Sequence, residues 1–282
     1  MPSFDEATVL GQARSENFPV AMFLLPRRAR DRLMAIYGVA RLIDDVGDEA
    51  DGDRLAQLDW LEADLGRATT GTAVHPLVRR LSPLIAELEL SVQPFHDLIE
   101  ANRLDQQGMR YETFDDLVGY CRLSAVPVGR LVLAVFGADT PGRLRLSDDV
   151  CIGLQVVEHL QDVGEDAARG RIYLPARDRA ACQVTEDDLL SDHAPLALQQ
   201  LVALEAARAR NLLSAGDALA ASLPWAQRAA VAGFVGGGLS ALDAIQRAGY
   251  DVLGTRCRPS PVRTGVRTLA TARGARSGEV AA

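Results

Sequence analysis

The sequence predicts an all-α protein built around one large core. Apolar residues recur at spacings of three and four through almost the whole chain, and runs that alternate apolar with polar residues are scarce. The composition is 48% hydrophobic and 24% charged over 282 residues, with a mean hydropathy of +0.02. Such a chain can bury a sizeable core and is not expected to be disordered. We therefore predict a single-domain helical fold.

The predicted helices follow one another with short polar connections. In chain order they cover residues 4–14, 27–47, 53–67, 74–88, 94–107, 113–136, 147–168, 185–191, 195–221 and 224–253. Capping chemistry supports some of the starts: Thr113 and Thr185 each precede an Asp by three residues, and Ser147 precedes an acidic pair. Pro127 falls inside the helix predicted for 113–136, so we expect a kink there. The connections are too short to be linkers between domains.

The net charge and the spacing of the cysteines narrow the classes of function that this chain could have. Thirty basic residues against 38 acidic ones give a net charge of −8, which disfavours nucleic acid as a partner. The four cysteines form no Cys-x-x-Cys pair, as expected in a reducing compartment. The N-terminus lacks a signal-peptide pattern, and the apolar stretch Ala229–Leu242, at 14 residues, is too short to cross a bilayer. We expect a cytoplasmic protein in which that stretch is a buried helix.

The C-terminal tail differs in composition from the rest. Residues 255–282 contain six Arg and one Glu, together with several Pro, Gly, Ser and Thr. This composition predicts a folded domain over residues 1–258 and a disordered, Arg-rich tail over 259–282. A solvated extension is the simpler interpretation of the tail, and peripheral contact with an anionic membrane, on its inner face, is the alternative.

A first acidic cluster lies in the helix predicted for 27–47 and just beyond it. Tyr37, Arg41, Asp44, Asp45 and Asp48 fall within an arc of about 100° at 100° per residue, so we expect them to share one helix face. Carboxylates four residues apart repel each other, and something should offset that repulsion. An Asp-Asp-x-x-Asp motif alone is usually a solvated face.

A second acidic cluster consists of Glu158, Asp162 and Asp166, spaced four and four in another predicted helix. Both clusters lie late in their predicted helices, so the dipole at a helix start does not explain them. Carboxylate oxygens suit Mg²⁺, and two facing clusters could hold about three ions against a diphosphate. The ions would stabilise a departing diphosphate and so favour a carbocation. His159, beside Glu158, is either an active-site base or a packed core histidine.

These motifs resemble those of the head-to-head trans-isoprenyl diphosphate synthases, the family of squalene, dehydrosqualene and phytoene synthases. The resemblance spans about residues 14–258. It rests on Asp44-Asp45-Val-Gly-Asp48, on Asp162-Val-Gly-Glu-Asp166 followed by Arg169-Gly-Arg-Ile-Tyr-Leu-Pro175, and on residues 120–129 and 249–253. It implies an isoprenoid-synthase fold with a central apolar cavity and an enzyme that acts on a prenyl diphosphate.

The resemblance also implies roles for individual residues. The catalytic side chains would be Tyr37, Arg41 and Tyr173. The Mg²⁺ ligands would be Asp44, Asp45, Asp48, Glu158, Asp162 and Asp166. The side chains that contact substrate would be Phe18, Tyr120, Ser124, Val128, Gln161 and Arg171.

Residues 15–21 resemble the start of the bacterial hopanoid-pathway branch, the hydroxysqualene synthases. This implies presqualene diphosphate as substrate, supplied by a sister enzyme from two farnesyl diphosphates, and no NADPH. Two positions depart from the family pattern: Glu158 stands where Asn is usual, and Gln161 where many members have Arg. A missing Arg disfavours the condensation, in which two diphosphates must be screened at once. The alternatives are a complete squalene, dehydrosqualene or phytoene synthase and a non-catalytic assembly or binding relative, which would be expected to lose its acidic ligands.

Overall fold

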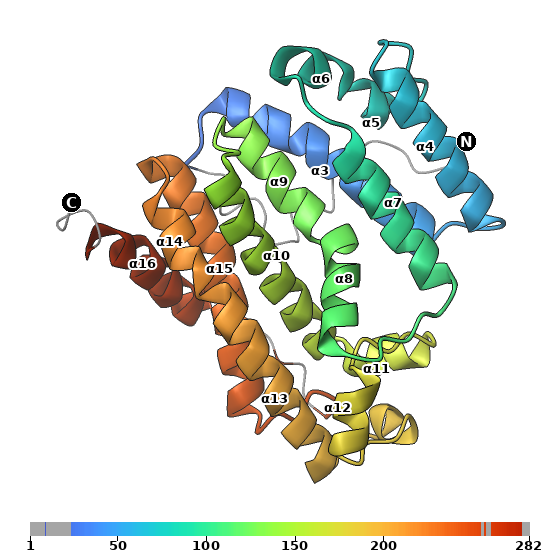
Figure 1. The fold of residues 1–282 in the computed structure, drawn as a ribbon, viewed down its shortest axis with the longest axis vertical. Helices are drawn as coiled ribbons and strands as arrows, with labels where there is room; N and C mark the ends of the chain where they lie inside the picture. Colours follow the sequence, from blue (N-terminus) through green and yellow to red (C-terminus); the bar gives the residue numbers. More distant parts are fainter. Residues whose placement is uncertain (1–8, 10–23, 255–256, 258–260, 278–282) are drawn as a thin grey trace. The chain divides into compact units, whose positions relative to one another are not determined.

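The computed structural model describes residues 24–254 and 261–277, together with residues 9 and 257 (Figure 1). The described residues form helices and no β-strand, which confirms the predicted all-α class. An isolated β-bridge pairs Arg110 with Ile172. The helix predicted for residues 4–14, and Phe18, lie outside the described residues.

The chain divides into two compact units, so the single-domain organisation stays a prediction. The first unit comprises Met1–Gln107 and Leu123–Leu144, and the second comprises Gly108–Arg122 and Arg145–Ala282. Each acidic cluster belongs to a different unit. The two units are therefore described separately.

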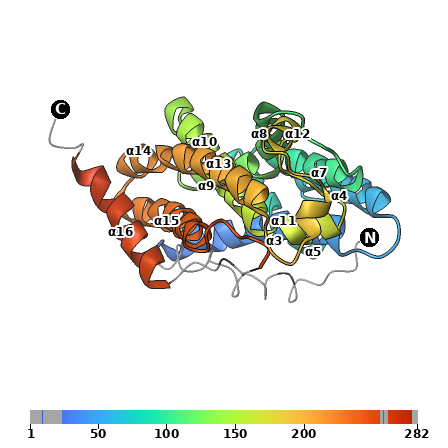
Figure 2. The ribbon, with the colours of Figure 1, turned by 90° about the horizontal axis from the view of Figure 1, so that it is seen from below.

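The first unit is organised around the long helix α3. Its described helices are α3 (Arg27–Asp48), α4 (Arg54–Ala68), α5 (Pro76–Arg79), α6 (Ser82–Leu88), α7 (Gln93–Gln106) and α9 (Val126–Val135). Helix α3 packs against α4, α5, α7 and α9 (Figures 1 and 2). Leu42, Ile43 and Val46 in α3 are fully buried in the core of this unit. The helix predicted for 74–88 is broken in two, because Pro83 starts a new helix and cannot continue the preceding one.

The second unit contains most of α8 and α10 and the remaining helices. They are α8 (Phe114–Ser124), α10 (Pro141–Gln161), α11 (Val163–Ala168), α12 (Ala176–Ala181), the 3₁₀ helix η1 (Asp187–Leu190), α13 (Leu196–Leu213), α14 (Ala215–Ala221), α15 (Trp225–Arg247) and α16 (Pro261–Ser277). Helix α15 packs against α13, α14 and α16. It is long and apolar enough to span a membrane, but 61% of its most apolar window is buried inside the fold, as in a core helix.

The capping predictions are confirmed at two starts and wrong at the third. The Thr113 backbone N–H donates to Asp116 Oδ2 at 2.8 Å, and the Asp116 N–H donates to Thr113 Oγ1 at 3.2 Å. Thr185 and Asp188 make the same reciprocal pair at 2.8 and 3.3 Å. Ser147, in contrast, is buried inside α10, which already begins at Pro141. A proline fits the first turn of a helix, so Pro141 was the better indication of where α10 begins than the acidic pair after Ser147.

The kink expected at Pro127 is a complete break. Helix α8 ends at Ser124 and α9 begins at Val126, with Ala125 between them at φ −120° and ψ −43°. Pro127 thus lies in the first turn of α9, where its missing N–H leaves no helical hydrogen bond unmade.

A helix occupies the segment for which the sequence predicts disorder. Residues Pro261–Ser277 form α16, which packs on α14 and α15, so the folded part continues past residue 258 (Figure 1). The predicted disorder is therefore wrong for these residues. Composition could not reveal the tertiary contacts responsible, among them an ion pair of 2.8 Å between Arg267 and Asp243.

Asp251 fixes the chain where α15 ends. Its carboxylate accepts hydrogen bonds from the backbone N–H groups of Ala194 at 2.8 Å and Gly254 at 3.0 Å, and from His193 Nδ1 at 2.8 Å. Burial by itself would raise the pKa of Asp251, but these donors outweigh it and lower the pKa to about 2. The motif at 249–253 therefore ties the end of α15 to the segment before α13.

We expect Asp251→Ala to lower the free energy of unfolding at pH 7 by roughly 1–3 kcal/mol, because it leaves backbone donors unpaired. Asp251→Asn keeps an acceptor oxygen, so it should lower the free energy of unfolding by less. A depressed pKa stabilises the fold above the ordinary Asp value of about 3.9, and this contribution disappears as the pH falls towards about 2. Urea titrations should thus show the gap between wild type and Asp251→Asn narrowing below pH 4. A gap that is constant with pH would contradict this role.

Candidate active site

The first acidic cluster lies in the last turns of α3, and its members differ in their exposure to solvent. Asp44 and Asp48 are exposed, whereas Asp45 is only 1% exposed. The Asp45 carboxylate forms an ion pair with Arg41, with 2.7 Å between Oδ1 and Nε. One residue turns the helix by about 100°, which is enough to carry Asp45 from the exposed face into the protein. The five residues thus lie on one arc of α3, but this arc runs from solvent into the protein, and its members differ in exposure.

Helix α7 supports this end of α3 from within the first unit. Asn102 Nδ2 donates to Asp44 Oδ1 at 3.2 Å and to the Leu98 carbonyl at 3.1 Å. Gln106 Nε2 donates to the carbonyl of Gly47 at 2.8 Å. A Cβ atom on Gly47 would lie 1.9 Å from Asn102 Oδ1, so the glycine of the motif makes room for the amide.

The sequence reasoning missed Asn102 and Gln106. A signal was present for the first, because Asn102 continues the apolar stripe of Phe95, Leu98 and Ile99 at helical spacing. A buried polar residue on such a stripe normally has a hydrogen-bonding partner. Tyr37 and Arg41 precede Asp44 on the same helix, and both side chains are partly exposed.

The second acidic cluster lies at a junction between two helices of the second unit. Helix α10 ends at Gln161, and Asp162 is the residue before α11, with Asp166 in the first turn. The continuous helix predicted for 147–168 is therefore wrong. So is the inference that the helix dipole has no part in this cluster, since Asp166 lies at the start of α11. Glu158 is exposed, and the side chain of Asp166 is 15% exposed.

Tyr173 lies in an aromatic cluster of the second unit. Its ring stacks on His159, with centroids 3.8 Å apart and planes 13° apart, and its centroid is 5.3 Å from that of Tyr120. Tyr111, which the sequence reasoning missed, stacks on Tyr173 with centroids 6.0 Å apart and lies tilted against Tyr120 at 5.4 Å. The Ala176 N–H donates to the Tyr111 carbonyl at 2.8 Å and holds the two segments together. All four ring side chains are buried.

His159 is buried and packs against Tyr173. Burial lowers its pKa to about 3, so the imidazole is neutral at physiological pH. Its Nδ1 lies 4.0 Å from Asp166 Oδ2 and its Nε2 lies 3.3 Å from Gln155 Nε2. Of the two interpretations of His159, the structure therefore favours the core residue.

We expect His159→Phe to keep the stack with Tyr173 and to retain near-normal turnover. His159→Ala should leave a cavity beside Tyr173, lower the free energy of unfolding by roughly 1–3 kcal/mol, and reduce kcat more than it raises KM. Chemical denaturation and steady-state kinetics of the two variants test this. An Ala variant with the stability and kcat of the wild type would show that the stack does not position Tyr173.

The remaining predicted substrate contacts are dispersed. Gln161 Nε2 donates to the carbonyl of Cys257 at 2.9 Å. Arg171 is partly exposed and borders a small hollow together with Asp166 and Tyr173. Ser124 and Val128 are partly exposed in the first unit, and Tyr120 belongs to the second.

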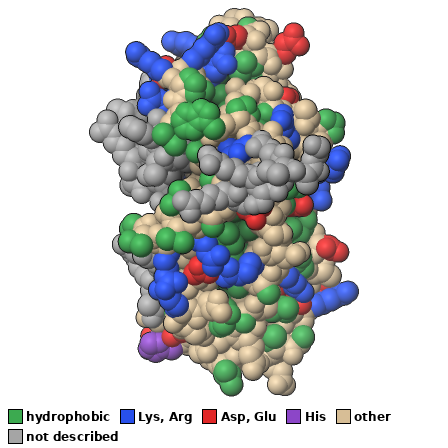
Figure 3. Space-filling model, turned by 90° about the vertical axis from the view of Figure 1, so that its left-hand side faces the viewer, with side chains coloured by type: hydrophobic (Ala, Val, Ile, Leu, Met, Phe, Trp, Pro, Cys, Tyr) green, Lys and Arg blue, Asp and Glu red, His purple; other side chains and the backbone are tan. Residues whose placement is uncertain are grey.

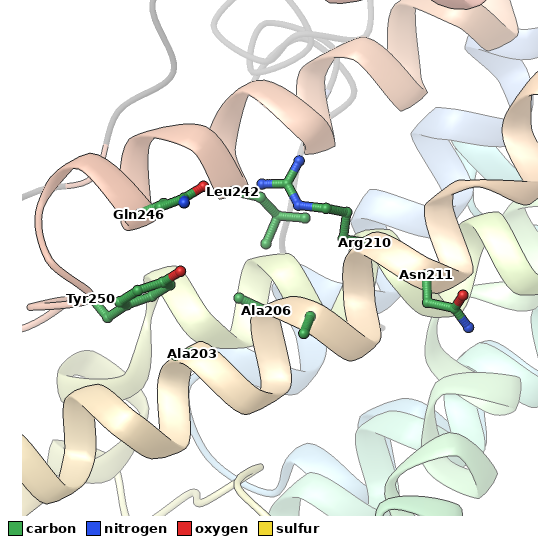
Figure 4. A pocket seen from close by; sticks show the side chains of 8 residues that line it. Ala203, Ala206, Arg210, Asn211, Leu242, Gln246 and Tyr250 are labelled. Atoms are coloured by element: carbon green, nitrogen blue, oxygen red, sulfur yellow. The ribbon is translucent and has the colours of Figure 1, made fainter.

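A larger cavity of about 360 Å³ lies between α13 and α15 in the second unit (Figure 4). Its lining residues are Ala203, Ala206, Ala207, Arg210, Asn211, Leu242, Gln246 and Tyr250. None of them was predicted as a site residue, and none carries a carboxylate. This cavity is not the site that the motifs describe.

The donors of both clusters fit Mg²⁺ chemically, because every proposed ligand atom is a carboxylate oxygen. Within the part of the chain that the structure describes, no three acidic, His or Cys side chains gather closely enough to bind a metal ion. Mg²⁺ commonly takes one or two carboxylates and completes its shell with water and phosphate oxygens. Exposed Asp44 and Asp48 suit that pattern better than buried Asp45.

Comparisons with known proteins agree with the motifs. A family model described as squalene/phytoene synthase matches residues 12–263. The hydroxysqualene synthase of Rhodopseudomonas palustris is 42% identical over 219 residues, covering 74% of this chain and 72% of the relative. That of Sinorhizobium fredii is 38% identical, covering 73% and 70%. The phytoene synthase of Arthrospira platensis is 31% identical, covering 86% and 83%.

Solved structures confirm the predicted isoprenoid-synthase fold. A crystal structure of squalene synthase HpnC from Alicyclobacillus acidocaldarius is 42% identical, with a TM-score of 0.80 and coverage of 87% of this chain and 94% of the other. A dehydrosqualene synthase in complex with a ligand is 24% identical, with a TM-score of 0.87 and coverage of 96% of both chains, and supports the fold alone. The chain therefore belongs to the squalene/phytoene synthase family, whose members are enzymes that act on prenyl diphosphates.

Proposed function

We propose that the chain acts as a hydroxysqualene synthase. In this reaction the carbon–oxygen bond between presqualene and diphosphate breaks, and the cyclopropylcarbinyl cation rearranges. A water oxygen then bonds to the final cation, and a proton is released. The overall change is presqualene diphosphate plus water to hydroxysqualene plus diphosphate, with no change of oxidation state that would require NADPH. The identity of 42% and 38% to hydroxysqualene synthases is the observation that carries this proposal.

The acidic residues are proposed to bind the diphosphate through Mg²⁺. In the first unit Asp44 and Asp48 would hold the metal, and in the second Glu158, Asp162 and Asp166 would do so. Mg²⁺ would neutralise the negative charge that grows on the departing diphosphate. Three Mg²⁺ ions per diphosphate are part of this proposal. Asp45 was predicted as a further ligand, and its ion pair with Arg41 supports a different role, which is to hold that guanidinium.

Arginine and tyrosine side chains are proposed to complete the site. Arg41 has a side chain that is 29% exposed and is anchored by Asp45, so its guanidinium can donate to a diphosphate oxygen without being free to swing away. Arg171 would donate in the same way. Tyr37 and Tyr173 would present ring faces to the cation. The other proposed contacts with the substrate are Ser124, Val128, Tyr120, Gln161 and Phe18.

The surroundings of the site belong to the same proposal. An apolar cavity would keep bulk water from the cation until the rearrangement is complete. A sister enzyme that condenses two farnesyl diphosphates would supply the substrate. The proposed location is the cytoplasm, at the inner face of the membrane, since substrate and product both carry long hydrocarbon chains.

Incubation with presqualene diphosphate and Mg²⁺, without nicotinamide, tests the function. We expect rapid conversion to an alcohol and little or no consumption of farnesyl diphosphate offered alone, because Gln161 supplies no charge to screen a second diphosphate. Mass spectrometry identifies the product. A hydrocarbon product, or efficient formation of presqualene diphosphate from farnesyl diphosphate, would instead indicate a complete squalene or dehydrosqualene synthase.

A further inference from the structure

Helix α16 is amphipathic in the opposite sense from an ordinary surface helix. Its outer face carries Val262, Val266 and Leu269, which are 75%, 60% and 55% exposed. The side towards the protein carries Thr268 and Thr271, and Thr271 is only 4% exposed. A surface helix normally buries its apolar face and exposes its polar one. Here the apolar face is left outside.

Specific contacts hold α16 in this orientation. A Cβ atom on Gly236 of α15 would lie 2.6 Å from the backbone nitrogen of Thr268, so the two helices approach closely at this point. Asp243 of α15 accepts hydrogen bonds from Arg267 Nε and Nη2, each at 2.9 Å, and from Arg210 of α13 at 3.2 Å. Burial tends to raise the pKa of Asp243, but these arginines lower it overall, so the carboxylate stays charged. Rotating α16 to bury its apolar side would break this ion pair.

The three exposed apolar residues form one continuous stripe. Their spacing of four and three places them within an arc of about 60°. Residues 261–277 also contain four Arg and no Asp or Glu, in a chain whose net charge is −8. Arg263, next to Val262, is exposed. Figure 3 views the side on which α16 lies in Figure 1, and basic, acidic and apolar side chains are all visible on that side.

These features select one kind of partner. An apolar stripe on a helix whose charged residues are all basic fits the surface of an acidic lipid bilayer. There the apolar residues can contact the acyl chains, and the basic residues can contact the anionic headgroups. A second copy of this chain would bring an equally basic helix to the interface, and the two would repel. The family match ends at residue 263, so most of α16 follows the matched segment.

We propose that the outer face of α16 docks on an anionic lipid bilayer, with Val262, Val266 and Leu269 entering the headgroup boundary. This inference takes its biological purpose from the proposed function, because it would place the enzyme where substrates and products with long hydrocarbon chains reside. Its physical basis is independent of catalysis. The Arg267–Asp243 pair acts as the anchor that keeps the apolar stripe facing outward.

Sedimentation of the full chain with vesicles tests the proposal without measuring activity. We expect binding to vesicles of phosphatidylcholine with about one third phosphatidylglycerol, little binding to phosphatidylcholine alone, and weakening in high salt. The triple variant V262N/V266N/L269N should bind the anionic vesicles at least roughly tenfold more weakly. Arg263→Gln should weaken binding less and reduce the salt dependence.

A matched control uses two other exposed leucines of the second unit. Leu190 and Leu196 are 59% and 69% exposed, and L190N/L196N should bind vesicles as the wild type does. Circular dichroism should show that all variants keep their helices. Equal binding of the wild type and the triple variant would overturn the proposal. So would a wild-type dimer in solution, measured by sedimentation equilibrium, that the triple variant loses without any vesicle binding by the wild type.

Discussion

Replacing Asp44 by Asn, or Asp162 by Asn, is expected to lower kcat by more than roughly a hundredfold while leaving the helical fold intact. Each change removes one negative charge from the site that would bind Mg²⁺ and diphosphate. Asn keeps a carbonyl oxygen in nearly the same place, so Asp44→Asn can still accept the hydrogen bond from Asn102. Turnover of presqualene diphosphate at saturating Mg²⁺, with circular dichroism on the same samples, measures both effects.

Each variant has a control on its own helix or the helix before it. Asp31→Asn removes an acidic residue of α3 that is 72% exposed, and Asp149→Asn removes an exposed one of α10. Both should keep near-normal activity. Asp45→Asn should differ again, because it leaves Arg41 without the counter-charge at 2.7 Å and should therefore lower stability as well as turnover. Near-normal activity of Asp44→Asn or Asp162→Asn would contradict the metal-binding role.

Gly47→Ala is expected to damage the first acidic cluster through packing rather than charge. Its Cβ would lie 1.9 Å from Asn102 Oδ1, so the amide must move and lose its hydrogen bonds to Asp44 and the Leu98 carbonyl. We expect a loss of roughly 1–3 kcal/mol in the free energy of unfolding and a clear fall in kcat. Urea denaturation and steady-state kinetics measure the two losses.

A double-variant cycle separates this mechanism from a general effect of replacing glycine in a helix. Asn102→Ala alone should cost stability, but in the Gly47→Ala background it should restore part of it by making room for the new methyl group. Gly66→Ala in α4 is the control, since a Cβ there meets nothing within 4 Å. Strictly additive losses at Gly47 and Asn102 would show that the two positions are not coupled.

Much of the fold can be predicted from the helical spacing of apolar residues in the sequence. The spacing of apolar residues predicted α3, α4 and α7 to within one residue of their observed bounds, and it predicted the start of α15 but placed its end six residues too late. It predicted less well where local chemistry interrupts a helix, as at Pro83 and at Asp162. Helical periodicity continues through such junctions, because the backbone hydrogen bond from Asp166 N–H to the Asp162 carbonyl, at 2.8 Å, preserves the spacing. Pattern alone therefore could not divide α10 from α11.

The candidate site shows the same limit. The motif placed Asp44, Asp45 and Asp48 in one cluster, and the fold buries Asp45 while it leaves the other two exposed. The partners Asn102 and Tyr111 are distant in sequence from the residues they contact, and only the fold brings them together. The orientation of α16 was unpredictable for a related reason, since it depends on Asp243 and Gly236 in another helix.

The source of the product oxygen tests the central claim most directly. The wild-type enzyme is incubated with presqualene diphosphate and Mg²⁺ in ¹⁸O-labelled water, without nicotinamide, and the product is analysed by mass spectrometry. If the cation is captured by water, the product is an alcohol that carries one ¹⁸O atom and elutes with hydroxysqualene. An unlabelled hydrocarbon, or an alcohol whose oxygen comes from the diphosphate ester, would contradict the account.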